Sequence, residues 1–273
     1  MNTIYKAEFF DTLSCAQEVH VSLGAYGRLT HQQAIQLALE VTPREPLLGY
    51  LSTKRLQICP QNLGQFTPEL ALQLKAELAH IEFRLHANVH IERQHKIVDI
   101  ADWPHEKEWF KQMAHLSHLL DAPVYTAHAG KRGTYSVSEV LQFTQEIEDL
   151  FGIPVGIEGH YPTPNGKQHW LISTWQEYQQ LLESGVHYAL DLSHLNILAV
   201  QTNHVEWSLV HELLSSPHCL EIHLSDNHGY ADQHLPLSNP HALPWWWSLL
   251  SSANPNATIF SEGRQRVPSV MMT

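Results

Sequence analysis

The chain has the length and composition of a compact folded protein. Its 273 residues come close to the ~250 residues that are usual for an α/β barrel. It is 43% hydrophobic and 16% charged, which excludes an intrinsically disordered chain. The 28 acidic and 16 basic residues give a formal net charge of −12, so nucleic acid is a disfavoured partner.

Short apolar runs alternate with longer amphipathic segments, a pattern that predicts repeated βα units around a parallel sheet. In chain order we expect strands at 18–24, 55–61, 82–91, 123–130, 154–161, 187–196, 220–226 and 257–263. Helical periodicity predicts helices at 30–41, 67–80, 103–120, 137–150, 174–182, 207–214 and 245–250. The fold class is therefore α/β, a (β/α)8 TIM barrel.

The two ends of the chain add to this prediction. Residues 264–273 are all that follow the last strand, so we expect the last outer helix to be short or absent. No linker or low-complexity tract divides the sequence, which predicts a single domain over residues 1–273. The N-terminus lacks a basic region followed by an apolar run, and no stretch approaches the ~18 apolar residues of a membrane span. We therefore expect a cytoplasmic protein with no membrane partner.

Histidine is unusually frequent, because 21 histidines exceed the 16 lysines and arginines combined. A lone histidine in an apolar run is more often a core residue than a ligand, but here acidic and imidazole side chains follow six strands in succession. Functional groups of α/β barrels gather at these strand ends, and buried carboxylates need a compensating charge. The candidates are His86, His128, Glu158, Asp191, His194, His223 and Glu262, with Asp232 and His234 in the loop after the seventh strand.

Ligands of this kind suit divalent metal ions. Oxygen and imidazole donors without thiolate fit zinc, manganese, magnesium or iron. The three cysteines, Cys15, Cys59 and Cys219, have no paired spacing, so neither a disulfide framework nor a cysteine zinc site is expected. The residues alone do not choose among the four metals.

The segment 223–237, HLSDNHGYADQHLPL, resembles the HxxDNxGxxDxHLPxG run of sugar phosphate isomerases and epimerases. Over residues 80–263 the array resembles the xylose-isomerase-like TIM-barrel superfamily, which also contains the endonuclease IV group of AP endonucleases. The epimerase resemblance implies one metal held by Glu158, Asp191, His223 and Glu262. The endonuclease resemblance implies a cluster of up to three ions that adds His86, His128, His194, Asp232 and His234.

The sequence departs from both branches. HAG at 128–130 and HANV at 86–89 replace the HPG and HAPY of the endonuclease group, and basic DNA-clasping loops are not evident. The loop after the seventh strand carries Asp232 and His234 where some epimerases carry a substrate-binding arginine.

The function expected first is a metal-dependent sugar or sugar phosphate isomerase or epimerase, and the alternative is a phosphoesterase acting on a small phosphate ester or abasic nucleic acid. A metal-dependent isomerase or epimerase would work through an enediolate, with Glu158 and Glu262 as acid and base. A phosphoesterase with two or three ions would explain the extra ligands. A catalytically silent metal-binding or sugar-binding barrel is the third.

The expected partner is a small molecule, a sugar or sugar phosphate, and the sequence leaves a homo-oligomer open. Lys131 and Arg132 could grip a phosphate or carboxylate, although a solvated basic pair fits equally well. His160 and Tyr161 follow Glu158 closely enough to line the pocket. Trp245 could stack on a sugar ring, although aromatic residues at the start of a barrel helix more often pack in the core.

Overall fold

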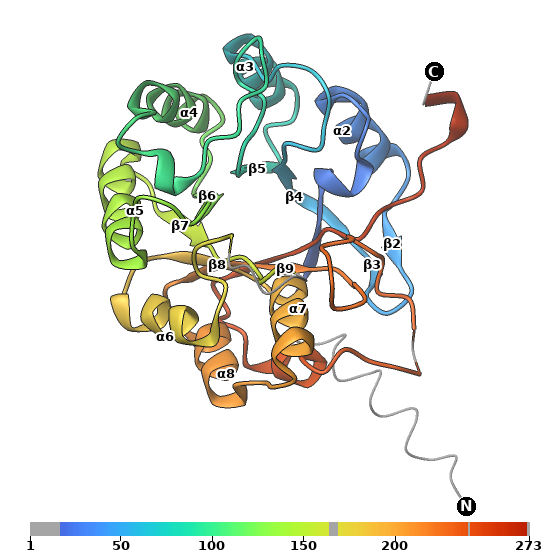
Figure 1. The fold of residues 1–273 in the computed structure, drawn as a ribbon. Helices are drawn as coiled ribbons and strands as arrows, with labels where there is room; N and C mark the ends of the chain where they lie inside the picture. Colours follow the sequence, from blue (N-terminus) through green and yellow to red (C-terminus); the bar gives the residue numbers. More distant parts are fainter. Residues whose placement is uncertain (1–16, 164–168, 240, 272–273) are drawn as a thin grey trace, which may run out of the picture.

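The computed structural model describes residues 17–163, 169–239 and 241–271. Its centre is a closed barrel of eight parallel strands in the order β1-β10-β9-β8-β7-β6-β5-β4, which confirms the predicted barrel (Figure 1). The strands are β1 (Val19–Ser22), β4 (Ser52–Ile58), β5 (Glu82–His86), β6 (Tyr125–His128), β7 (Val155–Glu158), β8 (Tyr188–Asp191), β9 (Cys219–Leu224) and β10 (Thr258–Ser261).

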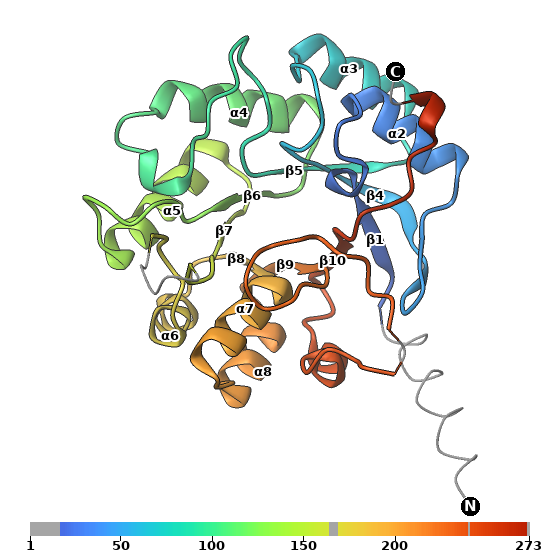
Figure 2. The ribbon, with the colours of Figure 1, turned by 45° about the vertical axis from the view of Figure 1, so that its right-hand side comes forward.

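An outer layer of helices surrounds the barrel (Figures 1 and 2). The α-helices are α2 (His31–Glu40), α3 (Pro68–Glu77), α4 (Lys107–Leu119), α5 (Val137–Phe151), α6 (Trp175–Ser184), α7 (Leu192–Thr202) and α8 (Trp207–Ser215). Short 3₁₀ helices are η1 (Leu23–Tyr26), η2 (Ile100–Asp102), η3 (Trp247–Ser252) and η4 (Ser269–Met271). The last strand is followed in the described residues only by η4, as the sequence predicted.

Local sequence explains why these elements begin where they do. Thr30 and Ser136 each form a capping box at the start of α2 and α5, which satisfies backbone N–H groups that the helix leaves free. Every residue of β7, β8 and β10 is buried. Such burial along the whole strand is typical of parallel strands that are covered on both faces.

Several predicted boundaries were wrong. The expected strand at 187–196 ends at Asp191, and α7 begins directly after it. The strands predicted at 82–91 and 154–161 end at His86 and Glu158, while the one predicted at 55–61 lies earlier, as β4. The helix expected from 103 begins at Lys107. In the described residues no α-helix joins β9 to β10, where η3 replaces the helix predicted at 245–250.

One addition to the barrel was not predicted. The short strands β2 (Arg44–Glu45) and β3 (Gly49–Tyr50) pair antiparallel to form a hairpin between α2 and β4. Its backbone reaches the loop after β9, because the Leu47 N–H donates to the Leu237 carbonyl at 3.1 Å. Among the described helices, none is long and apolar enough to cross a membrane.

Candidate metal centre

The carboxyl ends of the barrel strands carry the predicted ligands. His86, His128, Glu158 and Asp191 are the last residues of β5, β6, β7 and β8. Parallel strands of a barrel end at one rim, so these side chains converge. The other members are His194 in the first turn of α7, His223 in β9, Asp232 and His234 in the loop after β9, and Glu262 directly after β10. We call these nine residues the strand-end cluster.

Glu158 lies between four histidines of the cluster and is 1% exposed. Its Oε2 lies 3.0 Å from His223 Nδ1 and 3.5 Å from His86 Nε2. Its Oε1 lies 3.4 Å from His194 Nδ1 and 3.6 Å from His128 Nε2. The two oxygens of one carboxylate therefore face two different pairs of imidazoles.

A second group of contacts extends the cluster toward the loop after β9. His194 Nε2 lies 3.4 Å from Asp191 Oδ2 and 3.6 Å from Asp232 Oδ2. His234 Nε2 lies 2.9 Å from Asp232 Oδ2, and its Nδ1 lies 3.4 Å from Glu262 Oε2. All nine predicted ligand residues therefore come together at one rim.

The local backbone fixes this part of the cluster. Asp191 caps α7, because its Oδ1 accepts from the N–H groups of Ser193 and His194 at 2.6 and 3.3 Å. That leaves Oδ2 free to face the His194 ring. The loop after β9 is closed by reciprocal backbone hydrogen bonds between Asp226 and Leu235. In this loop His234, the residue before Leu235, has a positive φ of 46°. Positive φ values are uncommon for residues other than glycine and are found more often at functional sites.

Hydrogen bonds outside the cluster orient two of its imidazoles. His86 Nδ1 lies 2.9 Å from the Thr126 hydroxyl, which leaves Nε2 toward the carboxylates. His194 Nδ1 lies 2.9 Å from the Gly159 carbonyl, to which it can donate, so its Nε2 faces the aspartates. Partners of this kind fix the tautomer and ring orientation of metal-binding histidines.

The charges in the cluster depend on one another. Burial raises the pKa of Glu158, but the neighbouring histidines, His223 foremost, hold it well below its usual range. Burial lowers the pKa of His194, but the neighbouring carboxylates raise it to about 10. The same balance raises the pKa of His234 to about 11. The carboxylates therefore require positive charge close by, which either protonated histidines or metal cations can supply.

Two buried atoms of the cluster lack hydrogen bonds within the described residues. They are Glu158 Oε2 and His223 Nδ1, although they lie 3.0 Å apart. These two potential metal-ligand atoms, with the other residues of the cluster beside them, fit a cation. In the part of the chain that the structure describes, three sets of residues have ligand atoms within 4.8 Å of one another: His86, His223 and Glu262; His86, His128 and Glu158; and Glu158, Asp191 and His194.

Sequence comparison gives no relatives, since no family model and no curated protein matches the chain. Solved structures do match. A D-tagatose 3-epimerase-like protein is 16% identical with a TM-score of 0.63, covering 92% of both chains. An IolI protein with a bound zinc atom is 12% identical with a TM-score of 0.62, covering 94% of this chain and 91% of its own. A family 2 AP endonuclease from Brucella melitensis is 13% identical with a TM-score of 0.59, covering 92% and 95%.

The chain shares the (β/α)8 TIM-barrel fold of these structures, among them one described as a xylose isomerase domain protein. This fold was predicted from the resemblance of residues 80–263, and the structural match extends over more than nine tenths of the chain. At these levels of identity the likeness establishes the fold alone.

Two predicted substrate contacts lie beside the cluster in this barrel. The His160 ring stacks between His128 and Trp170, with centroid distances of 4.7 and 4.6 Å. The Tyr161 ring lies 4.8 Å from the ring of His194. These rings form an aromatic wall on the side of β6 and β7. His160 Nε2 is buried and makes no hydrogen bond to the described residues.

The other three predicted substrate contacts, Lys131, Arg132 and Trp245, make no hydrogen bond or ion pair with the cluster in the described residues. Arg132 is held by Glu177 at 2.6 Å and by the Trp170 carbonyl at 3.0 Å. Lys131 is exposed on the loop after β6. Trp245 donates from its ring to Asn196 at 3.0 Å and packs edge-on against another tryptophan, so its contacts are those of a packing residue.

Sequence reasoning missed two buried acidic residues next to the predicted ligands. Glu221 lies two residues before His223 in β9, and its Oε2 is 3.2 Å from His223 Nε2. Burial raises its pKa, but its hydrogen bond to His223 and the Arg84 guanidinium lower it to about 2. Asp99 lies 4.0 Å from His128 Nδ1. The alternation of strand residues would have placed Glu221 on the face of His223, whereas nothing in the loop sequence distinguishes Asp99.

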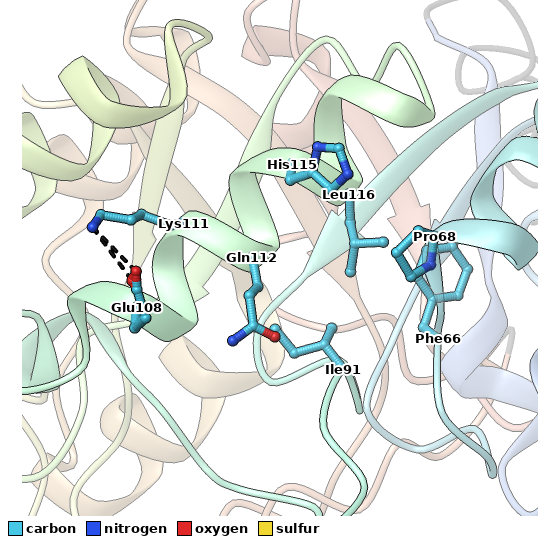
Figure 3. Close-up of a pocket in the computed structure, with 8 residues that line it drawn as sticks. All are labelled: Phe66, Pro68, Ile91, Glu108, Lys111, Gln112, His115 and Leu116. Atoms are coloured by element: carbon cyan, nitrogen blue, oxygen red, sulfur yellow. Dashed lines mark hydrogen bonds and ion pairs between the residues drawn. The ribbon is translucent and has the colours of Figure 1, made fainter.

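A pocket of about 230 Å³ lies elsewhere on the barrel (Figure 3). Figure 3 shows it beside α4, with one wall from the start of α3 and Ile91 below. Its lining residues are Phe66, Pro68, Ile91, Glu108, Lys111, Gln112, His115 and Leu116. None of them belongs to the strand-end cluster, so this pocket has no part in the chemistry of that cluster.

Proposed function

We propose that the chain is a divalent-metal-dependent hydrolase that cleaves a small phosphate ester with two or three ions in the strand-end cluster. The observation that carries the proposal is the position of Glu158, whose two oxygens face separate pairs of histidines. With metal bound, the Glu158 carboxylate would hold cations together with His223, His86 and His128. His194 would bind through Nε2, since its Nδ1 can donate to the Gly159 carbonyl. A carboxylate with both oxygens occupied is poorly placed to move a substrate proton.

The cluster offers three overlapping sets of ligand atoms. Glu158 belongs to two of them, one with His86 and His128 and one with Asp191 and His194, and His86 recurs in the third set, with His223 and Glu262. Bound ions would polarise a phosphoryl oxygen and acidify a water molecule that attacks phosphorus. Paired ions of this kind are a recurring feature of phosphatases and nucleases.

The protein's own residues would prepare the site for this reaction. Asp99 lies 4.0 Å from His128 Nδ1 and would place negative charge behind the imidazole, whose Nε2 is the nitrogen that faces Glu158. His160 and Tyr161 cover one side of the cluster and would exclude bulk water. Lys131, free of the ion pair that holds Arg132, would contact the phosphate of the substrate.

Charge supports a small substrate over a polymer. The net charge of −12 repels a long polyanion, and Arg132 is already paired with Glu177. A phosphorylated sugar or another small phosphate ester carries less charge to be repelled. We therefore propose a small molecule, and not nucleic acid, as the substrate.

One observation favours a second candidate, a sugar isomerase or epimerase. Glu158 and Glu262 come from different strands and both approach His223 Nδ1, at 3.0 and 3.8 Å. Two carboxylates beside one ion could act as acid and base on a bound ketose. The similar structures include proteins described as L-ribulose 3-epimerase and 3-keto-D-glucoside 4-epimerase.

One experiment separates the two functions. The protein is purified without chelator, its metal content is measured, and it is offered a panel of phosphomonoesters and a panel of ketoses in deuterated water. Phosphate release with two or three ions per chain supports the hydrolase. Deuterium entry at a sugar carbon with one ion per chain supports the epimerase and overturns the hydrolase.

A double variant, Asp232→Ala with His234→Ala, serves as the partner sample. The hydrolase proposal predicts that it loses at least one ion and most of its phosphate release, because these residues hold the outer part of the cluster. Unchanged metal content would contradict the assignment of these two residues as ligands.

A further inference from the structure

A layer of buried polar side chains lies directly beneath the strand-end cluster. Glu221 in β9 points to the same face as His223, because residues two apart in a strand share a face. It is 0% exposed, and its Oε2 lies 3.2 Å from His223 Nε2. The opposite ring nitrogen, Nδ1, is the one that faces Glu158 and Glu262.

The same carboxylate reaches a second histidine through a hydroxyl. Thr126 in β6 donates from its Oγ1 to Glu221 Oε2 at 3.1 Å. The Thr126 Oγ1 also lies 2.9 Å from His86 Nδ1. Since the hydroxyl proton is directed at Glu221, its lone pairs are left to accept from the His86 N–H. One carboxylate oxygen is therefore in hydrogen-bond reach of His223 Nε2 and, through Thr126, of His86. The Gln57 amide nitrogen lies beside it, 2.9 Å from His223 Nε2.

The charge of Glu221 is supported from other strands. Arg84 Nη1 in β5 lies 3.2 Å from Glu221 Oε1, and Gln57 Nε2 in β4 donates to Oε2 at 2.9 Å. An isolated buried carboxylate would be costly, and these partners offset that cost. Arg84 also pairs with Glu82, at 2.7 Å.

We propose that Glu221 is a positioning residue that holds His223 directly, and His86 through Thr126, in the tautomers needed to bind metal. This inference rests on the metal centre of the proposed function. A carboxylate, an imidazole and a metal in series orient the ring and raise its basicity, and loss of such a partner typically costs about 10–100-fold in metal affinity. Glu221 does not itself face the ions.

The structure supplies a matched control. Glu82 shares Arg84 with Glu221, but its ion pairs are to Arg84 and Arg55, and none of the contacts described above joins it to a ligand histidine. Glu82→Gln removes one carboxylate from the same arginine and leaves the histidines as they are. Glu221→Gln makes the same chemical change at the atom that contacts His223.

The test compares zinc affinity by competition with a chromophoric chelator, together with the visible spectrum of the cobalt-substituted protein. We expect Glu221→Gln to weaken zinc binding by about 10–100-fold and to shift the cobalt spectrum, and Glu82→Gln to change neither. Thr126→Val, which removes only the path to His86, should produce a smaller loss. Equal affinities for wild type and Glu221→Gln would overturn the proposal.

A further variant distinguishes a direct effect on metal binding from destabilisation caused by the loss of a partner of Arg84. Removing the Glu221 charge leaves Arg84 with one partner fewer in the barrel interior, so Glu221→Gln is also combined with Arg84→Met, which removes both charges. If the double variant folds and still binds zinc weakly, Glu221 acts on the ligands. If the double variant regains wild-type affinity, the carboxylate only neutralises Arg84 and the proposal is wrong. Failure of the wild type itself to bind zinc would instead refute the metal centre.

Discussion

Glu158 contacts four histidines of the strand-end cluster. Its substitution tests whether both of its carboxylate oxygens take part in holding metal. Glu158→Gln keeps the size of the side chain but removes the charge that faces His223, His86, His128 and His194. We expect a loss of metal affinity greater than the ~100-fold upper range for outer partners, and at least one ion fewer per chain. Elemental analysis after dialysis measures both. Full metal content would contradict this role.

His31 provides a prediction for pH away from the cluster. It lies in the first turn of α2, is 2% exposed and packs edge-on against Phe66. Burial lowers its pKa from 6.5 to about 4. Between these values the unfolded chain binds a proton that the folded chain does not, so the contribution is complete above pH 6.5 and is lost as the pH falls toward 4. The loss is on the order of 2–3 kcal/mol by pH 4.

The corresponding measurement is urea unfolding at pH 7.5 and pH 5. His31→Leu should show a smaller decrease in unfolding free energy between the two values than wild type. His211→Leu, at an exposed position on α8, should behave as wild type. Identical pH dependence for wild type and His31→Leu would rule out the burial effect.

The convergence of the strand-end residues could be predicted because their chemistry contradicts their surroundings. A carboxylate such as Glu158 in an apolar strand needs a partner, and the strand end fixes which rim it joins. Asp99 could not be found this way, since it lies in a loop whose path no periodicity predicts. Arg132 shows what sequence cannot supply: its position after His128 fits either substrate binding or a solvated basic residue, and only the structure shows its ion pair with Glu177 at 2.6 Å.

At the scale of elements, the β2–β3 hairpin holds the loop that carries part of the cluster. The Glu45 carboxylate is 0% exposed, accepts from the Leu237 N–H at 2.7 Å and from the Ser261 hydroxyl at the end of β10. Glu45→Ala should lower the free energy of unfolding by about 1–3 kcal/mol, because it leaves buried donors without partners. Urea titration checks this, with Glu40→Ala at the exposed end of α2 as the control.

Glu45→Gln separates hydrogen bonding from charge. Its amide oxygen can still accept from Leu237, so most of the stability should be retained. If the loop also positions Asp232 and His234, then Glu45→Ala should lose metal that Glu45→Gln keeps. Equal stability of the alanine variant and wild type would show that the hairpin does not hold this loop.

The elements were predictable where one periodicity dominated. The eight strands are short and most of their residues are buried, and side-chain caps mark the starts of α2, α3, α5 and α6. Helix α7 was missed because Leu192, Leu195 and Leu198 continue the apolar run of β8, and a short apolar run fits either structure. The change from strand to helix depends on the Asp191 carboxylate, which caps the first turn.

At the scale of the whole molecule, the cluster joins segments that are far apart in sequence. Its members come from β5 to β10 and from the loops after them, so bound metal would link six of the eight strands at one rim. Without metal, the carboxylates are neutralised by histidines whose pKa values are raised, to about 10 for His194 and about 11 for His234. Metal binding must displace these protons.

This arrangement predicts that metal stabilises the entire fold. A ligand that binds only the folded chain contributes about 2.7 kcal/mol at a free concentration of 100 times its Kd, which corresponds to a rise in Tm of about 5–10 °C for a chain of this size. The rise should shrink at acidic pH, where protons compete for the histidines. Calorimetry with zinc, and with a chelator added afterwards, measures both effects. The Asp232→Ala, His234→Ala double variant should gain less than wild type, since part of the linking site is gone. A Tm that zinc leaves unchanged at neutral pH would mean that the histidines neutralise the carboxylates on their own, and that the cluster is a buried ion-pair network with no metal.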